Sequence, residues 1–96
     1  MNTYELVVII HPDLDDEAID QALTRIKNWI ADGGGKIEKT DNWGKRRLAY
    51  EIQKQREGIY YLMDVILPPT SIAELERNII ILEPVMRHMI VTKNES

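Results

Sequence analysis

The sequence has no cysteine among its 96 residues. This absence excludes disulfide scaffolds, zinc ribbons, iron–sulfur sites and thiol catalysis, and it is compatible with a reducing cytoplasm. Phenylalanine is also absent, so Ile, Leu, Val and Met must fill most of the core, helped by two Trp and four Tyr. The hydrophobic fraction of 44% is enough for one small core, and we expect a single domain over residues 1–96.

Long hydrophobic runs are missing as well. The longest apolar runs, such as residues 6–10 and 79–82, are far too short to span a bilayer. No apolar stretch follows a basic region near the N-terminus, so a signal peptide is not expected. We therefore predict no contact with a membrane.

Positive charge is scarce overall but concentrated in one segment. The formal net charge is −4, yet residues 36–56 hold seven Lys/Arg and three Asp/Glu, a balance of +4. A polyanion responds to the field within roughly 10 Å at moderate salt, so a local patch can bind it. The run Lys45-Arg46-Arg47, beside Trp43, favours phosphate contacts and base stacking. Lysine and arginine also protect the edges of sheets, and both interpretations stay open at this point.

Hydrophobic periodicity and turn residues predict six elements. Residues 3–10 are rich in β-branched side chains, and the stretch 14–35 has a helical apolar stripe, acidic residues at its start and three glycines at its end. Gly44 in the second strand indicates a bulge. Thr70 or Ser71 is expected to cap the second helix, and Ser71 with Glu74 matches a capping box. The expected order is strand 3–10, helix 14–35, strand 36–52, turn 54–58, strand 59–67, a helix after Ser71, strand 85–93, and a frayed tail over 93–96.

The order β-α-β-β-α-β predicts an α+β, ferredoxin-like fold, with a four-stranded antiparallel sheet and two helices on one face. The first and third strands are central, and Tyr50 is interpreted as a core residue of the second. The core between sheet and helices should contain Tyr4, Leu6, Val8, Ile26, Ile30, Leu75 and Ile79. The other face of the sheet would then expose a group of apolar side chains typical of a protein contact. This group consists of Val7, Ile9, Tyr60, Leu62 and Ile66.

Other candidate sites have simpler explanations. Residues 33–36, GGGK, follow a helix, whereas a phosphate-binding loop must precede one, so we assign them to the cap and turn at the helix end. The acidic residues from Asp13 to Glu17 lack the calcium-loop pattern and are explained by helix capping. His11 and His88 have no nucleophile nearby in the pattern, and Leu62 and Asp64 interrupt the aromatic box of an RNA-recognition motif. We expect no metal site, no cofactor and no catalytic residue.

The second strand carries the most specific motif, W/L-G-x-R-x-L-A-Y-x-I. Its residues are Trp43, Gly44, Arg46, Leu48, Ala49, Tyr50 and Ile52. Together with Tyr4-Glu5 and the segment RHMIVTK at 87–93, it resembles the bacterial small-subunit ribosomal protein six family over residues 2–93. Glu51 stands where the family often has proline, and the long charged C-terminal extension of some members is absent.

The resemblance implies a structural constituent of the small ribosomal subunit rather than an enzyme. It implies binding to the central domain of 16S rRNA together with small-subunit ribosomal protein eighteen, in support of 30S assembly and translation on the cytoplasmic ribosome. The isolated protein should be monomeric. The expected RNA-binding residues are Lys45, Arg46, Arg47, Trp43, Arg87 and Lys93, and the apolar open face should meet the partner protein.

The alternative hypothesis, from another functional class, is a free-standing regulatory ferredoxin-like domain that binds a small molecule or self-associates. A glycine-rich loop after the first strand would favour it, but residues 11–16, HPDLDD, contain no glycine. An acylphosphatase-like enzyme would need a phosphate-cradling loop at the same place, and this sequence lacks one.

Overall fold

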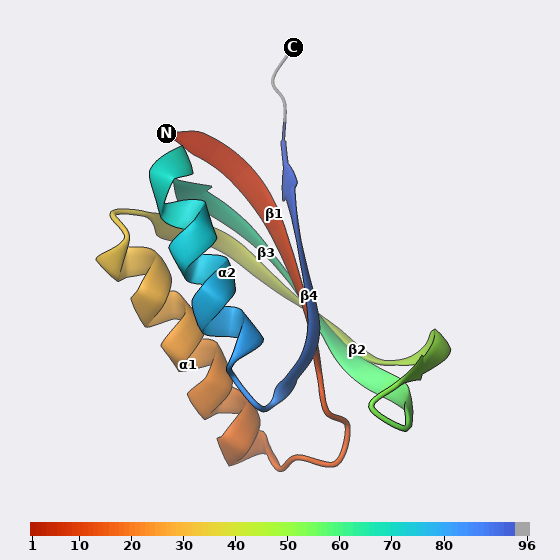
Figure 1. The fold of residues 1–96 in the computed structure, drawn as a ribbon. Helices are drawn as coiled ribbons and strands as arrows, with labels where there is room; N and C mark the ends of the chain where they lie inside the picture. The colour runs from red at the N-terminus through yellow and green to blue at the C-terminus, as the bar shows by residue number, and fades with distance from the viewer. Residues whose placement is uncertain (94–96) are drawn as a thin grey trace.

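The computed structural model describes residues 1–93 and contains the predicted elements in the predicted order. Figure 1 labels them, and a short 3-10 helix, η1, precedes the second α-helix. Their bounds are β1 (Asn2–Ile10), α1 (Asp16–Asp32), β2 (Lys36–Ile52), β3 (Gln55–Leu67), η1 (Pro69–Ser71), α2 (Ile72–Ile80) and β4 (Val85–Thr92).

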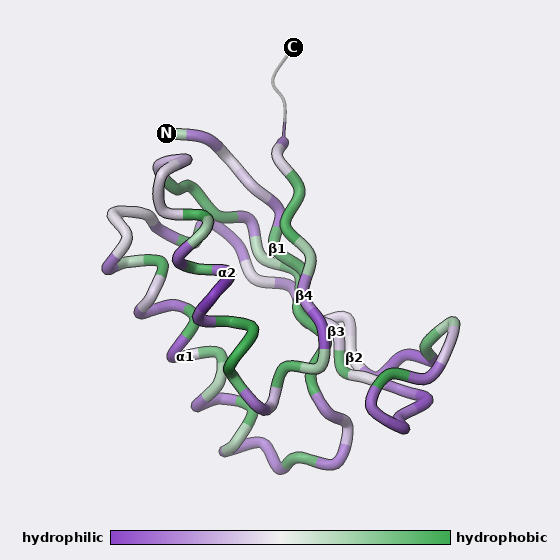
Figure 2. Tube along the Cα trace, viewed as in Figure 1, coloured by the Kyte–Doolittle hydropathy of each residue, from purple (hydrophilic) through white to green (hydrophobic). Residues whose placement is uncertain are grey.

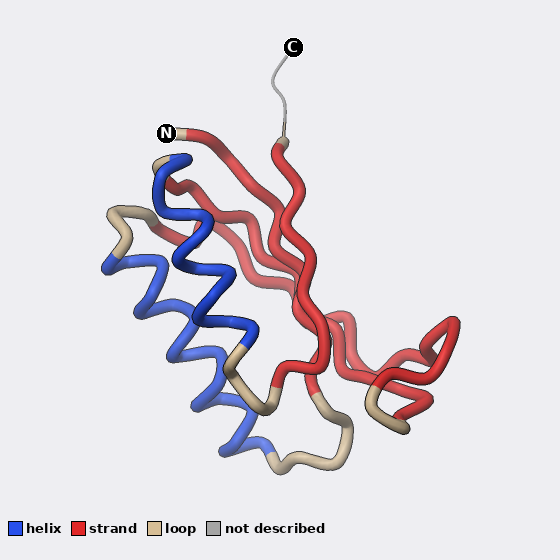
Figure 3. Tube along the Cα trace, viewed as in Figure 1, coloured by secondary structure: helices blue, strands red, loops and turns tan. Residues whose placement is uncertain are grey.

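The four strands form one antiparallel sheet in the order β2-β3-β1-β4. Both helices lie on the same face of this sheet, and the other face is left open (Figures 1 and 3). The predicted ferredoxin-like architecture is therefore confirmed, with β1 and β3 in the centre. We call the face away from the helices the open face.

Local chemistry fixes both ends of α1. The carboxylate of Asp15 accepts a hydrogen bond from the backbone N–H of Ala18 at 2.8 Å, which caps the first turn. At the other end Gly34 adopts a positive φ of 88°, and the N–H of Gly35 reaches the carbonyl of Ile30 at 2.9 Å. This backbone pattern satisfies carbonyl groups that a helix end leaves without partners.

The core lies between the sheet and the two helices, and all seven side chains predicted for it are buried. Along both helices the hydropathy alternates between polar and apolar residues, as expected for helices with one buried side (Figure 2). Tyr61 lies at the edge of this core, where burial raises the pKa of its hydroxyl, with smaller contributions from Asp20 and Asp16.

Three local predictions are wrong. The strand β3 begins at Gln55, so the turn shrinks to Gln53 and Lys54, which both have positive φ. No side chain caps α2, because the Ser71 hydroxyl donates instead to the carbonyl of Gly33 at 2.7 Å. Lys93 is not frayed, since its N–H donates to the carbonyl of Thr3 at 2.9 Å. The remainder of the predicted tail, 94–96, lies outside the described residues.

Among residues 1–93, neither helix combines the length and the apolar character needed to cross a lipid bilayer.

Candidate nucleic-acid and protein interface

The outer part of the β2–β3 hairpin extends beyond the sheet, and we call residues 43–58 the arm (Figure 1). It begins at a register shift between Asn42 and Gly44, where Gly44 has a φ of 77°. The Asn42 side chain accepts a hydrogen bond from the Gly44 N–H at 2.7 Å and fixes this bulge. The bulge predicted from Gly44 is confirmed, and it sets the direction in which the arm leaves the sheet.

A second irregularity curls the arm back over the open face. Arg47 pairs with Glu57 and Ile52 pairs with Gln55, so residues 48–51 face only Arg56 across the hairpin. The surplus on one strand forces that strand to bend. The bend brings Leu48 down onto the open face of the sheet.

This contact forms a second, smaller core made of Ile9, Leu48 and Met86, with Ile52 and Tyr60 packed against it. Gly58 permits the close approach, because a Cβ atom there would lie 2.3 Å from the Ile9 Cγ2 atom. The arm is therefore packed against the sheet at its base.

Polar contacts tie the arm to the body of the protein at two further places. At the tip, the Gln53 side-chain oxygen lies 2.9 Å from the His11 Nε2 atom. Nearer the middle, Arg87 on β4 donates a hydrogen bond to the Tyr50 hydroxyl, and its guanidinium lies 5.8 Å from the centre of the Tyr50 ring. The arm is thus attached to the loop after β1 as well as to β4.

The basic run Lys45-Arg46-Arg47 lies on the arm, and all three side chains are exposed. Because side chains alternate along a strand, Lys45 and Arg47 project to one side and Arg46 to the other. Arg46 joins Trp43: its Nε atom donates to the Trp43 carbonyl at 3.3 Å, and its guanidinium lies 5.4 Å from the ring centre. Trp43 is 46% exposed.

The other two predicted RNA contacts lie apart from this run. Arg87 belongs to the contact with Tyr50 on the open face. The ammonium of Lys93 lies 2.8 Å from the Asp64 carboxylate, and β3 pairs Asp64 with Lys39 rather than with the arm. Lys93 and the arm therefore lie at different ends of the sheet.

The five apolar residues predicted for the open face do not form one exposed group. The register places Val7 beside Leu62 and Ile9 beside Tyr60, and the alternation assigned from the sequence is confirmed. Ile9, however, is only 8% exposed because the arm covers it, so its assignment to a free surface is wrong.

Ile66 is separated from the rest of the predicted group. It pairs with Thr3, and the row between it and Leu62 contains Glu5 beside Asp64. The exposed apolar part of the open face is therefore centred on Val7, Tyr60 and Leu62.

Sequence reasoning missed the contribution of β4 and of the arm. Met89 and Val91 are exposed on the open face beside β1, at 52% and 47%. Tyr50, interpreted as a core residue, is 61% exposed and forms part of a hollow, so that interpretation is wrong. The motif residues Leu48, Tyr50 and Ile52 alternate and thus share one side of the strand, a signal that could have placed all three on the open face.

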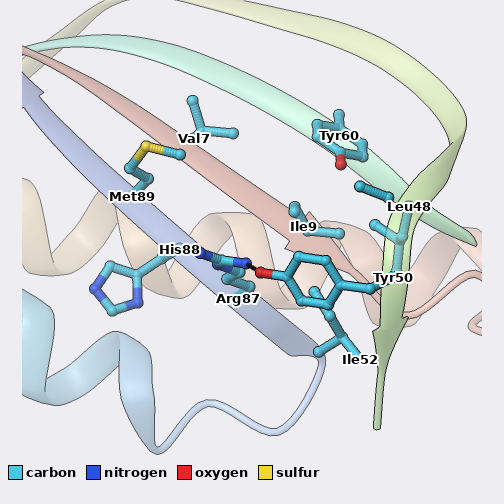
Figure 4. A pocket seen from close by; sticks show the side chains of 10 residues that line it. Val7, Ile9, Leu48, Tyr50, Ile52, Tyr60, Arg87, His88 and Met89 are labelled. Atoms are coloured by element: carbon cyan, nitrogen blue, oxygen red, sulfur yellow. Dashed lines mark hydrogen bonds between the residues drawn. The ribbon is translucent and has the colours of Figure 1, made fainter. Parts of the chain in front are cut away.

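The hollow lies between the arm and the sheet and measures about 200 Å³ (Figure 4). Within residues 1–93, no group of three or more His, Asp or Glu side chains is placed to hold a metal ion. The exposed chemistry of this region consists of arginine and lysine side chains on the arm and apolar or aromatic side chains on the sheet.

Comparisons with known proteins agree along the whole described chain. The family model of ribosomal protein S6 matches residues 3–92. Small ribosomal subunit protein bS6 of Rhodococcus opacus (strain B4) is 44% identical over 95 residues, which cover 99% of this chain and 100% of the relative. Small ribosomal subunit protein bS6 of Mycobacterium tuberculosis (strain ATCC 25177 / H37Ra) is 46% identical over 87 residues, 91% of each protein.

Solved structures give the same result. The crystal structure of 30S ribosomal protein S6 from Thermotoga maritima superposes with a TM-score of 0.89 at 29% identity, covering 96% of this chain and 87% of that one. The C-terminal domain of the MgtC protein from Mycobacterium tuberculosis matches with a TM-score of 0.64 at 10% identity, which is a likeness of fold alone.

Proposed function

The chain belongs to the ribosomal protein S6 family of the small ribosomal subunit, and on that premise we propose that it binds the central domain of 16S rRNA together with small-subunit ribosomal protein eighteen. In this role it is a non-catalytic structural component of the ribosome in the cytoplasm. It acts as one domain, monomeric until it meets these partners, and supports assembly of the 30S subunit and translation.

The exposed basic run on the arm supports the RNA part of the proposal. The arm carries five Lys/Arg and two Asp/Glu, whereas the whole chain has a net charge of −4. Arginine binds phosphate through a planar fork of N–H donors, and release of counterions adds to the affinity. Arg46 in particular is held against Trp43 and needs little further ordering to contact a phosphate.

The apolar part of the open face supports the protein part. Val7, Tyr60 and Leu62 are partly exposed on the central strands, and Met89 extends the same surface onto β4. Because the helices cover only the opposite face, these side chains can be buried only by the arm or by a partner. The single observation that carries the proposal is that this apolar surface lies directly beside the basic arm in a chain of this family.

The substitution Leu62→Asp tests the proposal. A carboxylate buried in the contact without a partner costs several kcal/mol, so protein eighteen should bind at least about tenfold more weakly by isothermal titration calorimetry. The matched control is Ile81→Asp, because Ile81 is 76% exposed and follows α2, on the helix side of the sheet. The control should bind protein eighteen as the unmodified chain does.

Equal affinity of the Leu62→Asp variant and the control would mean that the partner docks elsewhere. Unfolding of the Leu62→Asp variant, checked by circular dichroism, would mean that Leu62 is needed in the isolated fold. Tyr60→Ala would be a less direct test, because Tyr60 packs against the second core.

A further inference from the structure

The hollow beneath the arm has walls from four strands. Val7 and Ile9 of β1 form its floor, Tyr60 of β3 and Met89 of β4 lie at its sides, and Leu48 and Tyr50 of the arm lie over it (Figure 4). Its volume is about 200 Å³. An apolar cavity of about 150 Å³ can hold benzene, so this hollow has room for one aliphatic or aromatic side chain.

The rim of the hollow carries a positive charge without a matching negative one. Arg87 points across the opening to the Tyr50 hydroxyl, which accepts one of its N–H groups (Figure 4). A guanidinium has five N–H donors, and the Tyr50 hydroxyl still has its own proton to donate. Among the described residues, none that lines the hollow is an Asp or Glu.

His88 does not alter this balance. It lines the hollow, but its imidazole turns away and lies 2.9 Å from the Glu76 carboxylate on α2. The Arg87 guanidinium and the Tyr50 hydroxyl are therefore donors at the opening, above an apolar floor.

We propose that this hollow is an anchor site for one apolar side chain that has a carboxylate next to it, supplied by an extended segment of the partner protein. The inference rests on the proposed function and names the chemistry of the partner. The apolar side chain fills the space between β1 and the arm, and the carboxylate accepts hydrogen bonds from Arg87 and Tyr50. A charge-assisted pair of this kind is among the stronger polar contacts in an interface.

Occupation of the hollow also fixes the arm. Leu48 and Tyr50 lie on the same strand as the basic run, with Leu48 directly after Arg47. A side chain wedged beneath Leu48 and Tyr50 holds this strand in place. The partner therefore limits the motion of the strand that carries the basic run as it docks, and the two binding events reinforce each other.

Two substitutions test the anchor. Val7→Phe enlarges a side chain on the floor of the hollow and so fills it, and its control Ala73→Phe introduces the same aromatic side chain at an exposed position on α2. Arg87→Gln removes the charge at the rim, and its control Arg77→Gln removes one from α2. By isothermal titration calorimetry, Val7→Phe and Arg87→Gln should each weaken binding of protein eighteen at least about tenfold, and the controls by less than about twofold.

A small probe tests the same site without the partner. In a nuclear magnetic resonance titration, N-acetylleucine at millimolar concentration should shift the methyl signals of Val7 and Met89, and N-acetylleucinamide should shift them less. Val7→Phe should abolish the shift of the Met89 signal, and Ala73→Phe should leave both signals shifting as in the unmodified chain.

The outcomes separate the two proposals. If the unmodified chain binds protein eighteen and the four variants bind it equally well, the anchor is overturned and the proposed function stands. If the unmodified chain does not bind protein eighteen, the proposed function fails. The acetylleucine titration then decides alone: shifts at Val7 and Met89 support an apolar carboxylate ligand, and no shifts overturn it.

Discussion

Arg46 is held in place before the phosphate contact that we propose for it. Its Nε atom is hydrogen-bonded to the Trp43 carbonyl and its guanidinium is stacked over the Trp43 ring. Both contacts reduce the rotamer freedom that a long side chain must lose when it binds phosphate. Lysine could not replace it here, because an ammonium group has neither the planar surface nor the fork of donors.

Replacing Arg46 and Arg47 by alanine should weaken binding to an rRNA central-domain fragment. Each arginine that contacts a phosphate displaces about one counterion, so the slope of log K against log salt should flatten by roughly 1 to 2 units. The measurement is filter binding over a range of salt concentrations, in the presence of protein eighteen.

The matched control replaces Arg25 and Arg77, which are exposed arginines on α1 and α2. It removes the same net charge from the helix side and should leave the slope unchanged. If both double variants behave alike, the basic run only protects the edge of the sheet from pairing.

For single residues, the sequence predicted the face of the sheet that a side chain occupies better than it predicted whether that side chain is exposed. Alternation along β1 and β3 assigned Val7 and Leu62 to the open face, because that assignment depends only on neighbours in the strand. The burial of Ile9 and the exposure of Tyr50 depend on where the arm curls. The curl follows from a three-residue surplus on one strand, and such a mismatch has no signature within a short window.

Among the elements, α2 is short and depends on packing. It has nine residues and no side-chain cap, so its stability comes from the buried side chains Leu75 and Ile79 rather than from its ends. Leu75→Ala should lower the free energy of unfolding by about 2–5 kcal/mol through lost burial and the cavity that it leaves. A loss below about half a kcal/mol in urea denaturation would show that α2 does not hold the core together.

The turn between β2 and β3 is strained. Gln53 and Lys54 have φ values of 52° and 66°, a region that costs non-glycine residues about 1–2 kcal/mol each. Lys54→Gly should therefore stabilise the protein by about half to one kcal/mol, after the greater freedom of glycine in the unfolded chain is subtracted. Thermal unfolding followed by circular dichroism measures this change.

The comparison variant is Thr40→Gly in β2, where φ is not positive. This variant also introduces glycine, but no backbone strain is relieved at this position, so it should destabilise the protein by about half to one kcal/mol. Destabilisation by both variants would mean that the turn is not strained in solution.

This turn also explains why the start of β3 was predicted four residues too late. Two-residue hairpin turns favour Asn-Gly or Asp-Gly, and Gln53-Lys54 has neither glycine nor asparagine. Gly58 instead suggested the end of a turn, but its role is to let β3 pass close to Ile9. The bounds of β2 and the bulge at Gly44 were correct, because glycine in the middle of a strand is a direct sign of irregular pairing.

Across the whole molecule, charge is divided between two sides. The helices α1 and α2 together carry six Asp/Glu and three Lys/Arg, whereas the arm carries five Lys/Arg and two Asp/Glu. The helices cover one face of the sheet, and the arm curls over the other. An RNA should therefore be repelled by the helix layer and attracted to the arm. Under the proposed function, this division would allow an acidic protein to bind a polyanion.

We propose that the arm faces rRNA while the helix layer faces away from it. Ultraviolet crosslinking of the unmodified chain to an rRNA central-domain fragment, with protein eighteen bound, followed by mass spectrometry of the crosslinked peptides, tests this claim most directly. We expect crosslinks within residues 43–56, at Trp43 and Lys45 above all, and none within α1 or α2. Crosslinks concentrated on the helices, with none on the arm, would contradict it.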